Sequence, residues 1–489
     1  MNGRIDCLRL ANTQNISILA FVMVLYSVRN AVPYIFFPLM ILITIYVGYT
    51  LLCESKKIAT ITNVLKIMHP FFIFVAIEII SFITAINYNH IDIIRYVKDF
   101  YFYICYFFLI CTIIRTKEDV SVLIKYMTKF FFWFGCGISI ISAFKYFYAP
   151  DVLTIVGSPK RTIYGTSLMT DYNFFSLFFI NAIILNLYKI YNDNDQKHWK
   201  GIVMAIAFMF WIVIMSSSRR GTAVAIILYA ACLILTIVPP LYKKLFNKHT
   251  YKRNLLFVIM TTIFMVLSYT HVVFYQQSDN RISKILKFDV TYIERSNTVI
   301  GYRLNSIIGH DFIKIKNNPS KPLYTGINIV QNNENVIKTV EEGSNKLVES
   351  RKDCWERSKE TYSNYSITQK ILGTGFRYLQ YFYYPDDLLS TSHPHFQPYA
   401  ILLMSGIVGL LLWLFLIAYI SYIYLKRIKA FWMLALLFSI NFIFGIFSNS
   451  NFLGMSMLLF LIIIPFIYNH IDKEDNKIEN ADKDSRYTF

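Results

Sequence analysis

Four short segments of the sequence contain the residue types that bind anions and transfer protons. Arginine suits a diphosphate because its planar guanidinium donates two parallel hydrogen bonds and stays charged at neutral pH. A neutral imidazole can accept a proton from a hydroxyl group under the same conditions. The candidate residues are Arg161, Asp171 and Asn173 in segment 158–173; Arg219 and Arg220 in segment 216–221; Arg351 and Trp355 in segment 351–376; and His393 and His395 in segment 393–409.

Long apolar helices must position these segments. Hydrophobic residues make up 55% of the chain and charged residues 16%, and the charges cluster in short runs between apolar stretches. Each stretch has roughly 17–25 residues, the length of a helix that crosses the hydrocarbon core of a bilayer. The stretches are apolar all round, which argues against a soluble all-α protein. The sequence therefore predicts an all-α, polytopic integral membrane protein.

About twelve transmembrane helices are predicted, with one large loop between the ninth and the tenth. The chain then divides into an N-terminal transmembrane bundle of about nine spans (1–275), the loop (276–397), C-terminal spans (398–468) and a polar tail (469–489). Within the loop, 301–316 and 353–372 have helical character. The predicted spans are 13–30, 33–52, 68–87, 97–114, 128–148, 172–189, 201–217, 221–239, 255–275, 398–425, 430–448 and 452–468.

The lysines and arginines of the short loops set the orientation of these spans. Basic residues gather in 56–57, 115–125, 197–200, 243–253 and 426–429, which twelve spans place on one side together with both termini. The positive-inside rule makes this side cytoplasmic, so the large loop and the four segments face outward. The basic residues behind the net charge of +18 then serve to orient the spans in the membrane. They do not form one continuous soluble face, which argues against nucleic-acid binding.

Arg161, Arg219 and Arg220 lie on the outer face against this rule. Positive charge that insertion disfavours needs another reason to be there. Contact with lipid headgroups is one explanation, and an anion site is the one we prefer. A single arginine or histidine at a span end is more often an anchor or an interfacial residue, so the argument depends on the whole set. No cysteine and histidine cluster has zinc-ligand spacing.

The order and spacing of the four segments resemble the bacterial O-antigen ligase and O-antigen polymerase family. The family has an Arg followed by Asp-Pro-Asn, and here Arg161 precedes Asp171-Tyr172-Asn173. It has Ser-Arg-Gly at the outer end of a span, and here Ser218-Arg219-Arg220-Gly221 stands at that place.

The second half of the resemblance lies around the large loop. The family has Arg, three residues, Trp and then Gly-x-Gly, matched here by Arg351, Trp355, Gly373 and Gly375. It has His-Pro-His-Asn and a Gly eleven residues after the second His. His395 and Gly406 keep that spacing, while Phe396 stands at the Asn position.

The resemblance implies a metal-independent glycosyltransferase of the bacterial inner membrane with no cofactor. Its donor would be an undecaprenyl-diphosphate-linked glycan, and its acceptor lipid A-core, a protein or a lipid-linked repeat unit. It implies that the four arginines hold the diphosphate of the donor, which lies among the membrane lipids. Asp171 and Asn173 would support them. His395 would be the first candidate base and His393 the second. Ligase and polymerase remain open.

Two other classes remain open on the residues alone. A polysaccharide transporter or lipid-linked glycan flippase would place ionisable residues along a central path. Only a few such residues fall in predicted spans, notably Glu78 and Lys145, and Glu78 can equally be a paired structural carboxylate. A receptor or scaffold acting through the outer loop would leave the arginine and histidine set unexplained.

The predicted topology can be tested with reporters that are active only outside the cytoplasm. A reporter fused after Phe489 should be silent, because an even number of spans returns the chain to the cytoplasm. A reporter inserted near Asn333 should be active. The reverse pattern would place the arginines and histidines on the cytoplasmic face and contradict an outer site.

Overall fold

The structure is a computed structural model, and the regular elements among the residues it describes are all α-helices, as predicted. The described residues are 2–27, 41–42, 45, 49, 62, 65–66, 69, 71–77, 79–80, 107, 110–114, 116–147, 172–192, 198–216, 218–238, 248–277, 351–375, 378, 394–448 and 460–469. Ten helices have bounds in the described part of the chain. They are α1 (Asn2–Ser27), α5 (Lys117–Phe147), α6 (Tyr172–Asn192), α7 (Trp199–Met215), α8 (Arg219–Ile237), α10 (Lys248–Gln277), α14 (Arg351–Ser363), α15 (Ile367–Leu372), α16 (Gln397–Lys426) and α17 (Ile428–Ser448).

Several helices begin at side chains that satisfy their free amide groups. The hydroxyl of Thr116 accepts from the amide of Asp119 at 3.1 Å, and the Asp119 carboxylate accepts from the Thr116 amide at 2.9 Å. Ser366 and Gln369 form the same reciprocal pair before α15. Such capping boxes fix the first turn of a helix and hence the residue at which the helix starts.

Five helices are long and apolar enough to cross a membrane: Lys117–Ala143, Asn173–Asn192, Arg220–Ile237, Thr250–Leu267 and Gln397–Lys426. Shorter apolar helices cover Thr13–Leu25, Trp199–Met215, Phe431–Phe447 and Phe460–Asn469. All nine overlap predicted spans, and the first five are long enough to cross a membrane. The predicted spans at 33–52, 68–87 and 97–114 lie largely outside the described residues, as do the loop residues 278–350 and the tail beyond 469.

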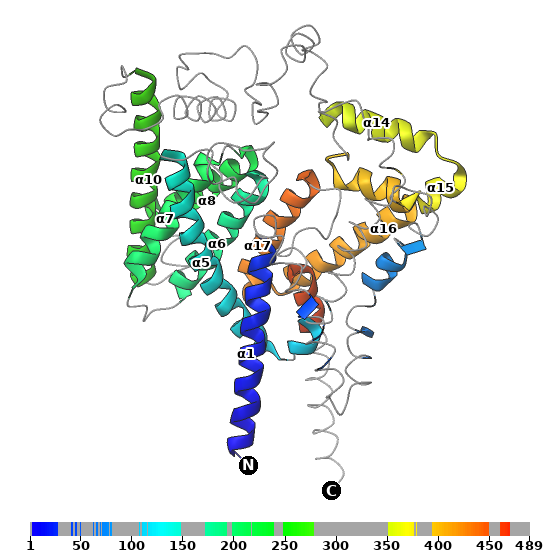
Figure 1. Cartoon of the computed structure of the whole chain (residues 1–489), viewed down its shortest axis with the longest axis horizontal. Helices are drawn as coiled ribbons and strands as arrows, with labels where there is room; N and C mark the ends of the chain where they lie inside the picture. The colour runs from blue at the N-terminus through cyan, green and yellow to red at the C-terminus, as the bar shows by residue number, and fades with distance from the viewer. Residues whose placement is uncertain are drawn as a thin grey trace. The chain divides into compact units, whose positions relative to one another are not determined.

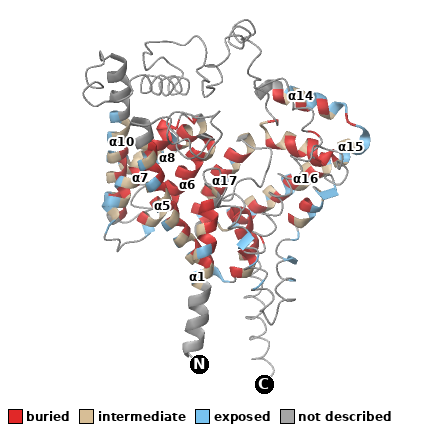
Figure 2. Ribbon diagram, in the orientation of Figure 1, coloured by how far each residue is buried: buried red, intermediate tan, exposed pale blue. Residues whose placement is uncertain are grey.

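Large apolar side chains remain exposed on these helices, and Figure 2 colours the exposed residues pale blue along the ribbon. Ile227 is 66% exposed, and Leu411, Phe415 and Leu425 are exposed to a similar degree. In water such surfaces would be unfavourable, because each exposed aliphatic side chain forfeits its transfer free energy. Lipid tails remove that cost, so the exposed apolar side chains support a membrane protein.

The chain forms two compact units, and the second of them contains residues 24–36 and 127–334. In this unit α6 packs against α7, α8 and α10, and these helices form the green and teal group in Figure 1. Of the five long apolar helices α6 is the most buried. Phe178 of α6 packs on Phe131 of α5 with ring centroids 5.2 Å apart. We identify α6 as the central helix of this unit.

Buried polar contacts connect the ends of α6, α8 and α10. The amide of Asn254 donates to the carbonyl oxygen of Cys232 at 2.9 Å and to the hydroxyl of Thr236 at 2.8 Å. Its oxygen accepts from the Tyr191 hydroxyl at 2.7 Å. Arg253, only 4% exposed, donates to the carbonyl oxygen of Ile190 at 2.6 Å. These bonds pair polar groups that would otherwise be buried in apolar surroundings without a hydrogen bond, at a cost in free energy.

The first unit contains residues 1–23, 37–126 and 335–489. Within it α16 packs against α14, α15 and α17. Trp413 of α16 stacks on Phe442 of α17 at 5.8 Å between ring centroids. The hydroxyl of Tyr424 donates to the carbonyl oxygen of Leu461 at 2.7 Å. Helix α16 is therefore the element on which the other described C-terminal helices assemble.

Helix α16 is broken at Gly406, where φ is +63° and ψ is −165°. The sequence predicts one continuous span over 398–425, and the break is a difference from that expectation. Its 30 residues would extend about 45 Å if straight, longer than the roughly 30 Å hydrocarbon core. Residues 407–426 alone extend about 30 Å. The head of α16, residues 397–405, is therefore not needed for crossing.

Replacing Asn254 with leucine should destabilise the second unit. The substitution leaves the Cys232 carbonyl and the Tyr191 hydroxyl without this partner, at a cost of about 1–2 kcal/mol. Thermal denaturation of the detergent-purified protein measures the effect. Asn192→Ala is the matched control, because the exposed Asn192 side chain donates to the Tyr188 carbonyl of its own helix. Equal melting temperatures for both variants would contradict the role given to Asn254.

Candidate functional site

The first two predicted segments meet at a buried hydrogen bond in the second unit. The hydroxyl of Ser218 donates to the side-chain oxygen of Asn173 at 3.0 Å. The same hydroxyl accepts from the amide of Gly221 at 3.1 Å and so caps the start of α8. Asn173 and Ser218 are both buried. The contact fixes the start of α6 to the turn that carries the paired arginines.

Gly221 allows a close approach of α6 and α8. A Cβ atom at this position would collide with the side chain of Ser176. Ser176 in turn donates its hydroxyl to the Asn173 carbonyl at 2.9 Å. The Gly of the Ser-Arg-Arg-Gly turn is thus required for packing, which is a reason for it that does not involve a ligand.

Arg219 and Arg220 are the first two residues of α8, directly after the capping Ser218. Arg220 is half-buried. The first turn of this helix contains no acidic residue. Because the N-terminus of a helix carries partial positive charge, two arginines there are unfavourable unless an anion is near. Consecutive helical residues are rotated by about 100°, so the two arginines cannot have equivalent positions.

Arg351 also begins a helix, as the first residue of α14. Four residues later Trp355 packs on Phe396, with ring centroids 5.4 Å apart. Trp355 thus connects the third predicted segment to the fourth. The predicted helical stretch 353–372 is confirmed, although it is divided into α14 and α15 by the capping residue Ser366.

The end of α15 and the break in α16 fit into each other through two glycines with positive φ. A Cβ atom at Gly373 would collide with the carbonyl of Met404, and one at Gly406 with the carbonyl of Ile371. Their φ angles are +76° and +63°. Only glycine adopts this backbone without strain and leaves room for the neighbouring carbonyl. The contact explains Gly373, the first glycine of the Gly-x-Gly, and Gly406, the glycine eleven residues after His395.

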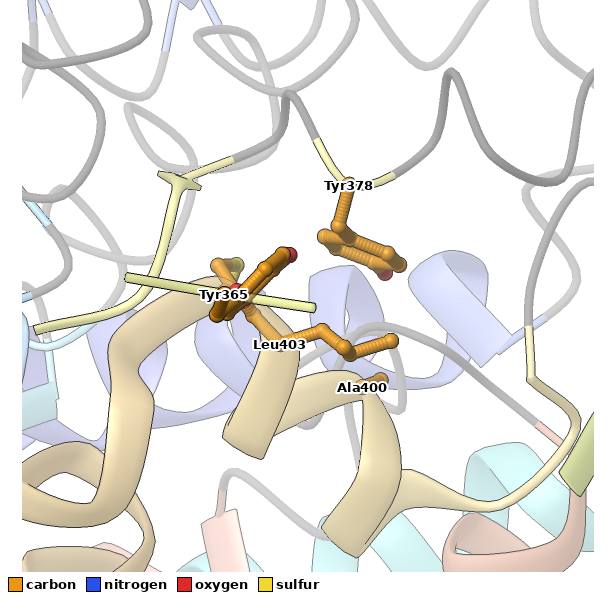
Figure 3. Close-up of a cluster of buried hydrophobic side chains, with 5 residues drawn as sticks. Tyr365, Tyr378, Ala400 and Leu403 are labelled. Carbon is orange, nitrogen blue, oxygen red and sulfur yellow. The ribbon is translucent and has the colours of Figure 1, made fainter. Parts of the chain in front are cut away.

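The break in α16 leaves the carbonyl oxygen of Leu403 without a partner inside the helix. Residues of the third segment donate hydrogen bonds to it instead. The amide of Thr374 donates to it at 3.1 Å, and the hydroxyl of Tyr365 donates at 3.3 Å. Tyr365 and Thr374 also bond each other through their hydroxyls at 2.8 Å. Figure 3 shows Tyr365 and Tyr378 beside Ala400 and Leu403 of α16. An unwound carbonyl is thereby paired inside the protein.

His395 lies immediately before this locked head of α16. Its φ is +53°, and no other non-glycine residue in the described part of the chain has a positive φ. Such a backbone is sparsely populated, costs roughly 1–3 kcal/mol and persists only where the surroundings impose it. Buried Pro394 before it and Pro398 in the first turn of α16 restrict the flanking backbone. The imidazole is half-buried.

The four predicted segments thus meet in two pairs, one in each unit. Asn173 is connected to the arginine turn, and the head of α16 is connected to α14 and α15. Arg161, Asp171 and His393 lie outside the described residues, and only the backbones of Arg219 and Arg351 are described. In the part of the chain that is described, no three His, Cys, Asp or Glu side chains could hold a metal ion together.

Sequence reasoning missed Tyr365 and Thr374, which hold the head of α16. Thr374 stands between the two glycines of Gly-x-Gly, so its position in the motif was a usable signal. Tyr365 had no such signal, because a tyrosine in a loop near a membrane is common. The capping role of Ser218 could have been found, because a serine before a long apolar run is a helix-start signal.

Comparison with known proteins gives no match: no protein-family model fits the sequence, and neither a curated protein nor a solved structure is similar to the chain. The class of protein is therefore defined by fold and geometry alone. The described part of the chain is helical, with several helices able to cross a membrane and a broken helix, α16, whose head is held by the end of α15 and the residues that follow it.

Alanine at Gly373 or Gly406 should destabilise the first unit and displace the head of α16. The added methyl group meets a backbone carbonyl, and the positive φ adds strain, together costing about 2 kcal/mol or more. The measurement is the melting temperature of each purified variant. Gly137→Ala and Gly201→Ala serve as controls, because nothing lies near a Cβ atom at either position. If all four variants melt alike, the proposed lock does not exist.

Proposed function

We propose that the chain is a membrane glycosyltransferase of the O-antigen ligase or polymerase type. It transfers a glycan from undecaprenyl diphosphate to an acceptor hydroxyl at the outer face of the bacterial inner membrane. The proposal includes about twelve spans, both termini in the cytoplasm and the large outer loop 276–397. The acceptor is lipid A-core, a protein or a lipid-linked repeat unit.

The observation that carries this proposal is the position of His395 before the locked head of α16. Its backbone is held in a strained conformation, and Tyr365 and Thr374, which flank α15, donate hydrogen bonds to the Leu403 carbonyl that the break in α16 releases. Strain of this kind clusters at functional sites, and broken membrane helices typically mark substrate sites. A histidine that served only as an interfacial anchor would need neither feature.

In the proposed reaction the acceptor oxygen attacks the anomeric carbon of the donor sugar. A new glycosidic carbon–oxygen bond forms, and the bond between the anomeric carbon and the diphosphate oxygen breaks. The bonding electron pair leaves with the diphosphate, and the proton of the acceptor hydroxyl moves to the neutral imidazole of His395. His393 is the second candidate for this role. No metal is needed, because a lipid diphosphate is already a competent leaving group.

The arginines would hold the diphosphate and stabilise the charge that develops on it. Arg161, Arg219 or Arg220, and Arg351 are assigned to this task, with Asp171 and Asn173 in support. The position of Arg219, Arg220 and Arg351 at helix starts favours it, because the helix N-terminus adds its own positive potential. Removing one such donor typically costs a few kcal/mol of transition-state stabilisation.

Reconstitution of the purified protein with glycan-bearing undecaprenyl diphosphate tests the proposal. The wild type should transfer glycan to acceptor, and the double variant Arg219→Ala/Arg220→Ala should lose about 100-fold or more in rate at equal protein level. Lysine at both positions should restore little, because an ammonium group is a point charge rather than a fork.

The control is Lys200→Ala, which removes an exposed cation near the start of α7 and should leave the rate unchanged. Lipid flipping without transfer would replace the proposal with the flippase alternative. If the double arginine variant kept the wild-type transfer rate and the wild-type affinity for the donor lipid, the assignment of these arginines to the diphosphate would be refuted.

A further inference from the structure

Gln397, the first residue of α16, has a side chain that is completely buried. Neither its amide nitrogen nor its amide oxygen has a hydrogen-bond partner among the described residues. An amide that is buried without partners costs roughly 1–3 kcal/mol by protein mutational data. A methionine of similar length would avoid that cost. The carboxamide at this position therefore needs a reason other than stability.

The place of Gln397 in the fold connects it to the proposed reaction. It lies two residues after His395, at the start of the head that Gly373 and Gly406 lock. Apart from Gln397 and Ser405, the buried residues of the head are apolar, and they include Ala400, Ile401 and Leu403. A polar group in such surroundings makes strong hydrogen bonds, because little water competes for it.

Half-buried aromatic rings surround the neighbouring Phe396. Its ring centroid lies 5.4 Å from that of Trp355, 5.3 Å from that of Tyr399 and 5.8 Å from that of Phe447. The indole nitrogen of Trp355 is buried and has no partner in the described part of the chain. Phe396 therefore connects Gln397, its neighbour in the chain, to an aromatic cluster that contains a second buried polar group without a partner among the described residues.

We propose that Gln397 is a specificity-determining residue that hydrogen-bonds neighbouring hydroxyl groups of a saccharide ring at the transfer site. The inference rests on the proposed function and names a further contact of the same site. A carboxamide presents one acceptor and two donors side by side, and each sugar hydroxyl both donates and accepts. A diphosphate only accepts, so it would leave the amide oxygen unsatisfied. An acyl chain would leave both atoms unsatisfied.

The ring can belong to the donor glycan or to the acceptor, since both meet at the base. The pairing of Gln397 with hydroxyls is the same in either case. Trp355 supplies the aromatic surface on which the C–H face of a pyranose ring can pack, and its indole N–H can donate to one more hydroxyl.

The experiment compares the full-length wild type with Gln397→Met, both purified in detergent. One probe is undecaprenyl diphosphate carrying the repeat-unit glycan of the producing cell, and the other is bare undecaprenyl diphosphate. We expect Gln397→Met to bind the glycan-bearing lipid at least tenfold more weakly and the bare lipid equally well. Its melting temperature without ligand should be equal to or higher than that of the wild type.

If the ring belongs to the acceptor, both lipids will bind the variant normally. In that case the KM of the variant for the acceptor should rise at least tenfold. The acceptor is supplied in membrane vesicles from cells that do not produce this protein. The KM for the glycan-bearing lipid should stay unchanged. The variant Gln397→Leu, which has neither a donor nor an acceptor, should show the same loss and provides a second test if Gln397→Met does not fold.

Thr261→Val is the matched control. The Thr261 hydroxyl in α10 is also buried without a partner among the described residues, and valine has nearly the same shape. This variant should keep full glycan binding and the wild-type KM for the acceptor. A loss equal to that of Gln397→Met would show a general effect of removing a buried polar group and overturn the inference.

One outcome overturns the inference but leaves the proposed function standing. In it the wild type binds and transfers glycan, and the Gln397 variants have a glycan-lipid affinity and an acceptor KM within twofold of the wild-type values. Gln397 would then be a buried structural amide satisfied by water. If the wild type neither discriminates between the two lipids nor transfers glycan, the proposed function fails and the inference fails with it. The two failures are therefore distinguishable in the wild-type data.

Discussion

The contact between the end of α15 and the break in α16 is the constraint on which the candidate site depends. Gly373 and Gly406 each admit a backbone carbonyl of the other segment where any side chain would collide. Interrupting a helix exposes carbonyl groups, and in lipid each unpaired group is costly. The donors Thr374 and Tyr365 remove that cost at Leu403. The break is thus a stable feature of the fold, and it separates a short head from a part long enough to cross the membrane.

The same principle accounts for the second unit. There Ser218, Asn173 and Asn254 pair polar groups at the helix ends, and these hydrogen bonds help to fix the register of the helices. The arginines remain at the start of α8, where the helix N-terminus already carries partial positive charge. Placing cations there is unfavourable in isolation.

Much of the fold could be predicted from the sequence, because continuous apolar stretches of span length have one stable solution in lipid. The nine predicted spans that fall on described apolar helices follow from this rule. The glycines of the motifs could be singled out by spacing, although their physical role could not. A glycine inside an apolar stretch is compatible with a straight helix, so the break at Gly406 depends on contacts with α15 that the sequence does not reveal.

The candidate site was predictable only in its residue types. Arg220, Asn173 and His395 belong to patterns whose spacing suggested chemistry, and the structure adds the cap, the buried bond and the strained backbone that position them. Gln397 could not be singled out, since a glutamine at a span end is unremarkable in sequence. Its significance comes from burial without partners, which only the packing of α16 defines.

The central claim is that His395 accepts the proton of the acceptor hydroxyl during glycan transfer. The most direct measurement is the initial transfer rate of the reconstituted wild type and of His395→Ala and His395→Gln between about pH 5 and pH 8. A base must be neutral to act, so the wild-type rate should fall on acidification. Both variants should be nearly inactive at every pH while they still bind the donor lipid. A wild-type rate and pH profile in His395→Ala would contradict the account.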